Sequence, residues 1–354
     1  MMNAALTKLR GKRIGLVTNQ SSVTNTWQLS RVAYHEALNL HCLYAPEHGL
    51  GGNVERGEGV RDSDDPLTGL EIRSLYQDEA TQIGSFDDLD GLLFDIQDVG
   101  VRFYTYISTL RQIMSIGLPV TVIDRPNPLG GTIVEGGLLA AEDESFVGPR
   151  GLPIRYGLTI GELAHWMNEA YDLKCELTTV DLQGWKRSEL WFNSSRPWVM
   201  TSPAIAHQES TFFYPGMCLL EGTNLNEGRG TSAPFELLGS PFIDPYSLSA
   251  DVNSLNLNGV VFTPISYTPT GGVLNHGLYG HITDVSVFRP VETTIRLLSL
   301  IRRRYPDELT ANDYFRKLAG FDFDELDDSE ILLERLRSES ATFALETRRL
   351  YRYE

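Results

Sequence analysis

The stretch GLLFDIQDVGVRFYTYISTLRQIMSI, which runs from Gly91 to Ile116, decides the fold. It opens with a short apolar run that ends in polar residues at Asp95, Gln97 and Asp98. From Thr105 onward its apolar residues recur at helical spacing. A buried strand, a polar turn and a helix in this order predict one unit of a parallel sheet covered by helices.

The same pattern recurs on both sides of this stretch. Further runs that are apolar first and polar last predict strands at residues 13–19, 40–47, 71–76, 119–127 and 175–182. Helical periodicity predicts helices at 27–38, 105–116 and 159–171, the last opening with Thr159 and Glu162 at the spacing of a capping box. We therefore expect an α/β fold, with a Rossmann-like, mostly parallel sheet and helices on both faces. In such a sheet the polar strand ends meet at one crest, where ligands bind.

A second, smaller part follows. Segment 234–245 is rich in loop-forming residues, 260–270 and 281–288 alternate like antiparallel strands, and 292–305 and 313–320 have helical periods. The chain has 354 residues, which exceeds the roughly 250 to 300 that one core usually holds. We expect a Rossmann-like catalytic domain over 1–230 and a smaller C-terminal α+β domain over 231–354 that forms part of the cleft.

Composition excludes several classes of partner. A net charge of −17 argues against nucleic acid, which is bound through clustered Lys and Arg. No segment approaches the roughly 18 apolar residues of a membrane span. The N-terminus runs directly into the first strand without the apolar region of a secretory signal, so we expect a cytoplasmic protein, although a secreted mature form would look similar. Three widely spaced cysteines predict buried thiols and neither disulfides nor zinc ligands.

Carboxylates at strand ends are the candidates for catalysis. Glu47 and His48 end the second strand in APEHG, and the glycine-rich loop that follows holds Glu55 and Glu58. That loop fits neither G-x-G-x-x-G nor the Walker pattern, so a sugar-facing loop is favoured over a nucleotide site. Glu135 lies between apolar residues and paired glycines, which predicts a raised pKa. The alternative for Glu135 is a solvated loop position.

The segment EGTNLNEGRGT, residues 221–231, is the most unusual. It places two carboxylates, two amides and a guanidinium directly after apolar MCLL, which we interpret as a core strand. Such a crowd of polar groups indicates either a polar ligand or a hydrogen-bonded loop at the domain junction. Hydrolysis of a glycosidic bond needs an acid and a base or nucleophile, and Glu221 or Glu227 facing Glu47 or Glu58 would supply such a pair.

The predicted catalytic candidates are therefore Glu47, Glu58, Glu135, Glu221 and Glu227. Other polar residues of these motifs are expected to bind substrate: His48, Asp95, Gln97, Asp98, Arg102, Tyr104, Asp124, Arg125, Asn127, Arg155, Thr223, Asn224, Arg229 and His276. Purely structural roles stay open for several of them, with Asp98 capping the next helix and Asp95 pairing with Arg102 or Arg125. No Cys/His spacing indicates a metal, and no G-x-S-x-G supports a serine triad.

Six motifs together resemble the NamZ-like exo-β-N-acetylmuramidases, a bacterial family formerly catalogued as a domain of unknown function. They are GKRIGLVTNQ, PEHG, GLLFDIQDVGVRFYTYISTL, DRPNPLGG with the following VEG, LTIGELA, and EGTNLNEGRGTSAPFELLGSPFID. They span most of the chain, and long ungapped signatures are more specific than one short motif.

The resemblance implies hydrolysis of a terminal, non-reducing N-acetylmuramic acid from peptidoglycan-derived chains, without a metal or organic cofactor. It also implies a cleft between a Rossmann-like domain and a smaller C-terminal domain. The lactyl carboxylate of the substrate needs a cation, for which Arg102, Arg125, Arg155 and Arg229 are candidates. Two alternatives stay open: a metal-dependent phosphoesterase using His48, Asp95, Asp98 and Asp124, and a sugar-binding module without catalytic activity.

Overall fold

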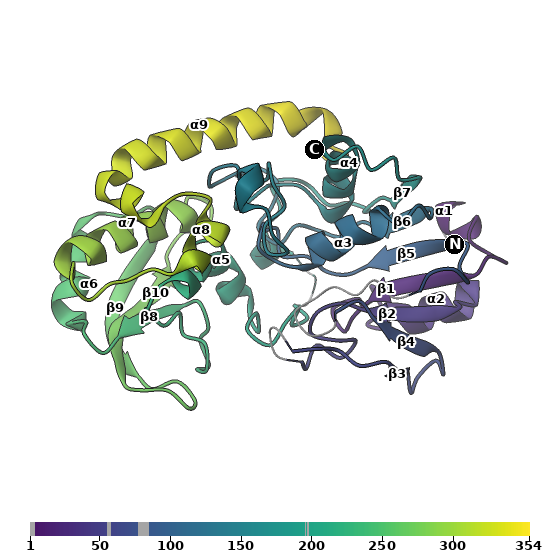
Figure 1. Ribbon diagram of the computed structural model, residues 1–354, viewed down its shortest axis with the longest axis horizontal. Coiled ribbons are helices and arrows are strands. Elements are labelled where there is room, and N and C mark those ends of the chain that lie inside the picture. Colours follow the sequence, from purple (N-terminus) through teal and green to yellow (C-terminus); the bar gives the residue numbers. More distant parts are fainter. Residues whose placement is uncertain (1–3, 55–57, 77–84, 195, 197) are drawn as a thin grey trace.

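The computed structural model describes residues 4–54, 58–76, 85–194, 196 and 198–354, and it contains two sheets that lie side by side (Figure 1). In this described part the larger sheet has seven strands, in the order β3-β4-β2-β1-β5-β6-β7. Their bounds are β1 (Ile14–Thr18), β2 (Cys42–Ala45), β3 (Ser63–Asp64), β4 (Glu71–Ser74), β5 (Gly91–Asp95), β6 (Val120–Ile123) and β7 (Leu177–Val180). All neighbours pair in parallel except β3 and β4, which confirms the mostly parallel sheet.

Helices cover both faces of this sheet, as predicted. They are α1 (Ala4–Thr7), α2 (Ser30–Leu38), α3 (Tyr106–Met114) and α4 (Ile160–Ala170). Successive side chains of a strand point to opposite faces, so β5 contributes to two cores. Leu92 and Phe94 pack with residues of α3 and α4, whereas Leu93 packs with Leu6 and Leu38 of α1 and α2. The capping box that opens α4 is present.

The smaller sheet is antiparallel, in the order β8-β10-β9, and is accompanied by helices, which confirms the predicted α+β part. Its elements are α5 (Gln208–Met217), β8 (Leu237–Ser240), α6 (Pro245–Ser254), β9 (Val260–Tyr267), β10 (Asn275–Ile282), α7 (Pro290–Arg304), α8 (Asp313–Ala319) and α9 (Ser329–Thr347). Short 3-10 helices complete the chain: η1 (Ala141–Asp143), η2 (Trp191–Asn193), η3 (Cys218–Gly222), η4 (Phe323–Asp328) and η5 (Arg348–Leu350). Helix α5 precedes the predicted division at residue 230, yet it packs against α7, which follows that division in the sequence. That division stays a prediction.

Two local predictions are wrong. Segment 281–288 is not a strand beyond Ile282, because Asp284 accepts hydrogen bonds from the backbone and hydroxyl of Ser286 and fixes a turn. Apolar MCLL is not a core strand either: it ends α5 and begins η3. An apolar run of four residues fits a buried helix as well as a strand.

Helix α9 crosses from the side of the smaller sheet to α4 (Figure 1). At its middle, the Ser340 hydroxyl donates to the carbonyl of Gly136 at 2.6 Å. The tail that follows returns to the larger sheet, where the Tyr353 hydroxyl donates to Asp124 at 2.5 Å. Nearby, the Arg187 guanidinium lies 3.4 Å from the Tyr351 ring centroid. Helix α9 was not predicted from the sequence.

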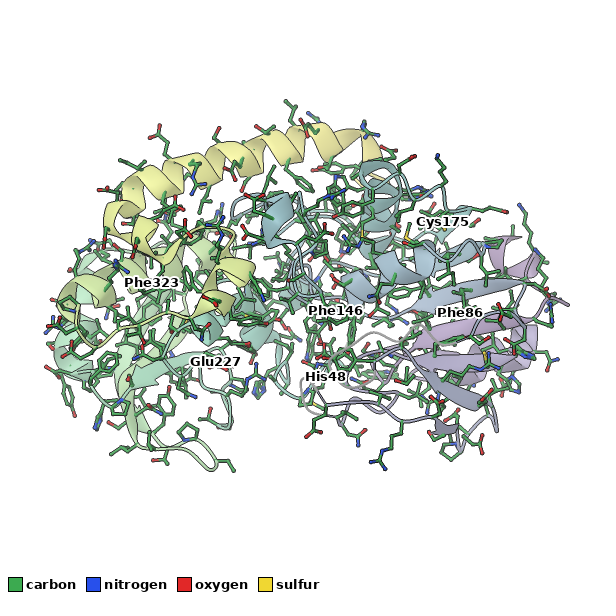
Figure 2. All side chains as sticks on the ribbon, in the orientation of Figure 1. His48, Phe86, Phe146, Cys175, Glu227 and Phe323 are labelled. Carbon is green, nitrogen blue, oxygen red and sulfur yellow. The ribbon has the colours of Figure 1, made fainter. Side chains whose placement is uncertain are left out.

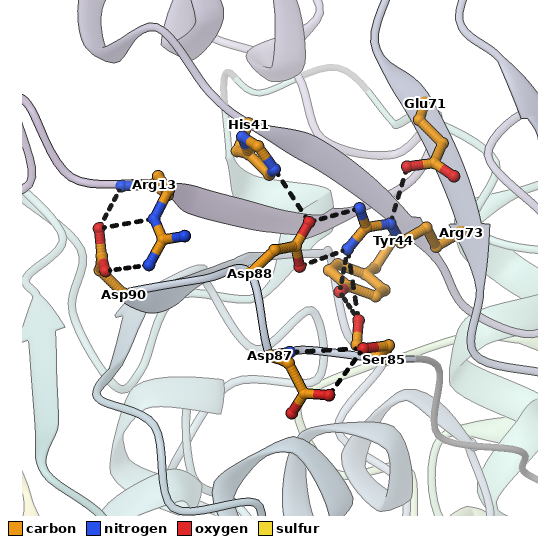
Figure 3. Close-up of polar contacts among 9 residues, drawn as sticks. All are labelled: Arg13, His41, Tyr44, Glu71, Arg73, Ser85, Asp87, Asp88 and Asp90. Atoms are coloured by element: carbon orange, nitrogen blue, oxygen red, sulfur yellow. Dashed lines mark hydrogen bonds and ion pairs between the residues drawn. The ribbon is translucent and has the colours of Figure 1, made fainter.

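The amino ends of the parallel strands are joined by ion pairs (Figure 3). Arg73 of β4 donates to both carboxylate oxygens of Asp88 at 2.8 and 2.7 Å, and His41 lies 2.9 Å from the same carboxylate. Arg13 makes a similar contact with Asp90 at 2.9 Å. This network ties β1, β2, β4 and β5 together at the edge opposite the crest. Among the helices of the described residues, none is both long and apolar enough to cross a membrane.

Candidate active site

A cleft of about 400 Å³ lies where the loops after β2 and β5 meet η3, the loop before β8 and α8. Its walls are formed by Glu47, His48, Tyr76, Phe103, Tyr104, Thr105, Ser145, Phe146, Val147, Ser202, Pro203, Ala204, Ile205, Tyr214, Cys218, Glu221, Arg229, Phe235, Tyr314, Lys317 and Leu318. Five predicted site residues are among them: Glu47, His48, Tyr104, Glu221 and Arg229. In Figure 2, His48 and Phe146 lie near the middle of the molecule, between the two sheets.

Glu47 enters the cleft from the larger sheet. It lies two residues after the end of β2 and is 4% exposed. Thr105, the residue before α3, donates its hydroxyl hydrogen to Glu47 Oε2 at 2.5 Å. The end of one strand and the start of a helix from the next unit thus fix one carboxylate at the crest, as expected for a doubly wound sheet.

His48 follows with a left-handed backbone, φ 71°, which is uncommon for a residue with a side chain. Its Nδ1 lies 2.8 Å from the carbonyl oxygen of Val54. A carbonyl only accepts hydrogen bonds, so Nδ1 carries the proton and Nε2 of the neutral ring is an acceptor. The turn therefore presents the imidazole in one tautomer to the cleft.

Glu221 enters from the opposite side and belongs to a charged triad. Arg229 lies between two carboxylates, with Nη2 2.6 Å from Glu221 Oε1 and Nε 2.9 Å from Glu227 Oε1. Burial raises the pKa of Glu227, the charge of Glu221 raises it further, and Arg229 works against both. Burial opposes the charge on Arg229, but the two carboxylates raise its pKa overall. Of the triad, Glu221 and Arg229 line the cleft, whereas Glu227 supports them from behind.

Aromatic rings form much of the remaining wall. Tyr104 is 5% exposed and packs edge to face against Tyr106 and Tyr214, with ring centroids 4.9 and 5.9 Å apart. Tyr214 in turn contacts Phe235 at 4.7 Å, and Phe235 lies 5.6 Å from the Arg229 guanidinium. Rings with polar edges suit the apolar faces and hydroxyl groups of a sugar.

Two of the five catalytic candidates lie away from this cleft. Glu58 is exposed and is not part of the wall, and Glu55 lies outside the described residues. Glu135 is buried, and burial raises its pKa as the sequence predicts, with Arg155 acting in the opposite direction. Arg155 Nη1 is 3.4 Å from Glu135, and the two backbones form an antiparallel bridge. This pair joins two loop segments, and Glu135 lines a different cavity, next to α7 and α9.

Several predicted substrate-binding residues instead stabilise strand-end loops. Arg102 is fully buried and donates to the carbonyls of Gly137, Leu152 and Leu318. Asp98 does not cap a helix, because it accepts from Tyr156 and from the backbone of Gly100; burial raises its pKa to about 6. Asn127 and Asp124 act in the same way. Asn127 forms hydrogen bonds with the backbone of Leu129 and Leu158. Asp124 accepts hydrogen bonds from Thr159, Gly161 and Tyr353.

Three predicted residues belong to the smaller part and make hydrogen bonds that stabilise their own loops or strands. Thr223 caps its own loop by donating to the carbonyl of Leu220 at 2.8 Å. Asn224 binds the backbone at Glu308 and Thr310, and His276 of β10 lies 2.7 Å from Ser266 on β9. None of the three lines the main cleft.

Asp95, Gln97 and Arg125 gather at another part of the crest. Arg125 pairs with Asp95 through Nε at 2.5 Å and Nη2 at 3.0 Å, which is one of the two structural pairings left open by the sequence. Gln97 and Arg125 line a second cleft, of about 440 Å³. The crest therefore carries two clefts where the motifs predicted one. Within the described ranges, no group of three His, Cys, Asp or Glu side chains is arranged to hold a metal ion.

Several polar residues that line the cleft were not predicted from the sequence, among them Thr105, Ser202 and Lys317. Thr105 follows Tyr104 and stands just before a predicted helix, which is a recognisable capping position. Lys317 lies in α8 and is exposed, with no motif around it to signal a site.

Comparison with known proteins decides the family. Models of the N-terminal and C-terminal parts of the exo-β-N-acetylmuramidase NamZ match residues 14–209 and 212–353. The chain belongs to the NamZ family. It is 41% identical over 326 residues to the peptidoglycan β-N-acetylmuramidase NamZ of Bacillus subtilis strain 168, an alignment that covers 88% of this chain and 79% of that relative.

Solved structures agree with the NamZ assignment. Two crystal structures of DUF1343 family proteins from Bacteroides fragilis NCTC 9343 match with TM-scores of 0.85 and 0.76, at 32% and 25% identity. Each match covers 98% of this chain and 96% of the other. The NamZ family membership expected from the six motifs is confirmed.

Proposed function

We propose that this NamZ family member is a glycoside hydrolase that releases N-acetylmuramic acid from the non-reducing end of peptidoglycan fragments. The family models and the Bacillus subtilis relative support the activity. The observation that carries the site is that Glu47 and Glu221 line one cleft from opposite elements. Glycoside hydrolysis uses two carboxyl groups that flank the scissile bond.

We assign a role to each carboxylate from the burial and the contacts that the structure shows for it. Arg229 holds a positive charge 2.6 Å from Glu221, which suits a carboxylate that acts as an anion, either as base or as nucleophile. Glu47 is 4% exposed and accepts a hydrogen bond from a neutral hydroxyl. We therefore assign Glu47 as the general acid that protonates the leaving oxygen.

The carboxylate of muramic acid needs a cation of its own. Of the four arginines considered from sequence, Arg229 alone lines the cleft among the described residues, and it already serves Glu221 and Glu227. Lys317 also lines the cleft, and no ion pair to it occurs among the residues that the structure describes. We therefore assign the lactyl carboxylate to Lys317, with Arg229 as a secondary contact.

The activity is tested with a 4-nitrophenyl β-glycoside of N-acetylmuramic acid and with an unactivated muramic acid disaccharide. We expect Glu47→Gln and Glu221→Gln each to reduce kcat by several orders of magnitude on the disaccharide. A good leaving group needs little protonation, so Glu47→Gln should recover much of its activity on the nitrophenyl substrate and Glu221→Gln should not.

Glu58→Gln is the matched control, because Glu58 is exposed and outside the cleft. Its kcat should stay within about twofold of the wild-type value, as for surface substitutions in general. Wild-type protein that releases no N-acetylmuramic acid from either substrate would refute the function. If Glu58→Gln lost activity while Glu47→Gln kept full activity, the proposed location of the active site would be refuted, but the hydrolase function would not.

Lys317→Met tests the carboxylate contact separately. We expect it to raise KM at least tenfold for a muramic acid substrate and to leave an otherwise identical N-acetylglucosamine substrate unaffected. Equal effects on both substrates would contradict the assignment. The cytoplasmic location and the absence of a required metal remain proposals, and unchanged activity in the presence of a chelator would support the second.

A further inference from the structure

The second cleft lies at the point where the sheet changes direction. From β1 the chain continues to its neighbour β2 on one side, and from β5 it continues to β6 on the other. The walls of this cleft come from the loop after β1, from the residues after β5 and β6, and from Trp191, Arg196 and Val199. In doubly wound sheets this switch point is where ligands bind. The main cleft lies to one side of it, beyond β2.

Two polar atoms in the second cleft have no hydrogen-bond partner among the described residues. Gln97 is 4% exposed, and its amide nitrogen donates to the carbonyls of Asp98 and Pro126 at 2.7 and 2.8 Å. These bonds fix the other end of the amide, so the Oε1 acceptor is left without a donor in this part of the chain. The indole N–H of Trp191, a residue that is 7% exposed, likewise has no acceptor. The Trp191 indole nitrogen is buried, and buried polar groups are normally satisfied, so its unsatisfied N–H indicates a missing ligand or water.

The charges of the cleft favour an anion. Arg125 and Arg196 both line it, and no carboxylate does among the described residues. Arg125 is committed to Asp95, whereas the Arg196 guanidinium has no hydrogen bond or ion pair with any residue that the structure describes. An unpaired cation in a half-buried position is unusual in a chain with a net charge of −17.

Trp27 adds an apolar face. Its side chain lines the cleft although the residue is 60% exposed, and its backbone has a φ of 65°. A bulky residue in the left-handed region costs free energy, which folded proteins tolerate mostly where function requires the conformation. An exposed indole beside amide and guanidinium groups is typical of carbohydrate and nucleotide sites, since it can cover one apolar face of a ring.

We propose that the second cleft binds a small acidic sugar at a site separate from the reacting one. Arg196 binds its carboxylate or phosphate, Gln97 Oε1 accepts a hydrogen bond from a hydroxyl or amide group, and Trp27 covers one face of the ring. The proposal does not depend on the proposed hydrolase function, because none of these groups belongs to the main cleft.

The two clefts share one wall segment. Arg196 and Val199 line the second cleft, and Ser202 to Ile205 line the main one. Between them, the carbonyl of Thr201 accepts from the Tyr106 hydroxyl at 2.7 Å and from the Gln20 amide at 3.0 Å. A ligand on Arg196 therefore contacts the segment whose other end forms the main cleft.

The test is a titration of the full-length protein followed by tryptophan fluorescence and equilibrium dialysis. The probes are N-acetylmuramic acid for a carboxylate, N-acetylglucosamine 6-phosphate for a phosphate, neutral N-acetylglucosamine, and inorganic phosphate. We expect at least one acidic sugar to bind tenfold or more tightly than the neutral sugar. Arg196→Gln should remove that preference, and Trp27→Ala should weaken binding of the same probe.

Arg150→Gln is the matched control, because the Arg150 side chain is 50% exposed and lines neither cleft. Lys317→Met separates the sites, since binding in the main cleft would respond to Lys317 and not to Arg196. The proposal is overturned if Arg196→Gln binds the acidic sugars as the wild type does, or if the neutral sugar binds equally well. It is also overturned if inorganic phosphate competes as tightly as the sugar phosphate, because the site would then take an anion only.

Discussion

Replacement of Arg229 by glutamine removes the one charge that Glu221 and Glu227 share. Their side chains are only 7% and 8% exposed, so the variant leaves two carboxylates close together with little water. Breaking a fully buried ion pair costs about 3 to 5 kcal/mol. Because the Arg229 side chain is 35% exposed, solvent screens part of this, and we expect a loss of about 2 to 3 kcal/mol at pH 8.

The loss should depend on pH in a defined direction. The pKa of Glu227 is already raised in the folded protein, and removal of Arg229 raises it further. A raised carboxyl pKa stabilises the fold at low pH and loses that contribution as the pH rises through the folded-state value. Arg229→Gln should therefore be mildly destabilising near pH 4 and strongly so at pH 8, as measured by urea unfolding at both pH values.

Adding Glu227→Gln to Arg229→Gln should recover part of the stability at pH 8, because one uncompensated charge is removed. Arg150→Gln serves as the exposed control and should change the free energy of unfolding by less than about 0.5 kcal/mol. A loss of equal size at both pH values would refute the electrostatic reasoning and would indicate a packing defect.

Three further predictions concern stability. Asp98 has a pKa of about 6 because of burial, above its unfolded value of about 4, so its contribution favours folding below pH 4 and is lost as the pH rises to 6. Asp98→Asn should remove that loss. Between pH 4 and 7 the free energy of unfolding of the variant should therefore rise by about 3 kcal/mol relative to that of the wild type. The same dependence on pH in both proteins would contradict this prediction. Asp88→Asn should lower the free energy of unfolding by about 1 kcal/mol at low salt and by less in 1 M salt, because the Asp88 side chain is 38% exposed. Glu71→Gln, which removes the other carboxylate beside Arg73, is the control and should have a smaller effect. Tyr353→Phe, which removes the hydroxyl between Asp124 and Leu182, should cost about 1 to 2 kcal/mol in thermal unfolding; no change would show that the tail is not anchored there.

The parallel strands of the larger sheet could be predicted because each lies in a short run that is apolar first and polar last, whereas the exposed strand β3 (Ser63–Asp64) has no apolar residue and was not predicted. Helix α9 could not, although it is 19 residues long. Ile331 and Leu345 of this helix are 69% and 72% exposed, so apolar residues occur on both its faces and blur the helical period. The apolar run before Glu221 was misread for a related reason, since four residues are too few to separate a helix end from a strand.

The site was predictable in part for a different physical reason. Glu47 lies two residues after β2, and Glu221 lies in η3 after three apolar residues, so both stand at the polar end of an apolar run that the sequence shows. Asp98 and Arg102 have the same sequence signature, but their partners are a tyrosine hydroxyl and backbone carbonyls from distant loops. Sequence gives no sign of which carbonyls a loop leaves unpaired, so a residue that holds a loop and a residue that holds a ligand look alike.

The return of the chain through α9 gives the two sheets a second connection. One covalent crossing would act as a hinge, and substrate entry would then depend on opening and closing. With α5 on one side and α9 with its anchored tail on the other, rotation of one sheet against the other must break the contacts of Tyr353 and Ser340. These two contacts therefore help to hold the two sheets, and with them the walls of the main cleft, in one relative position.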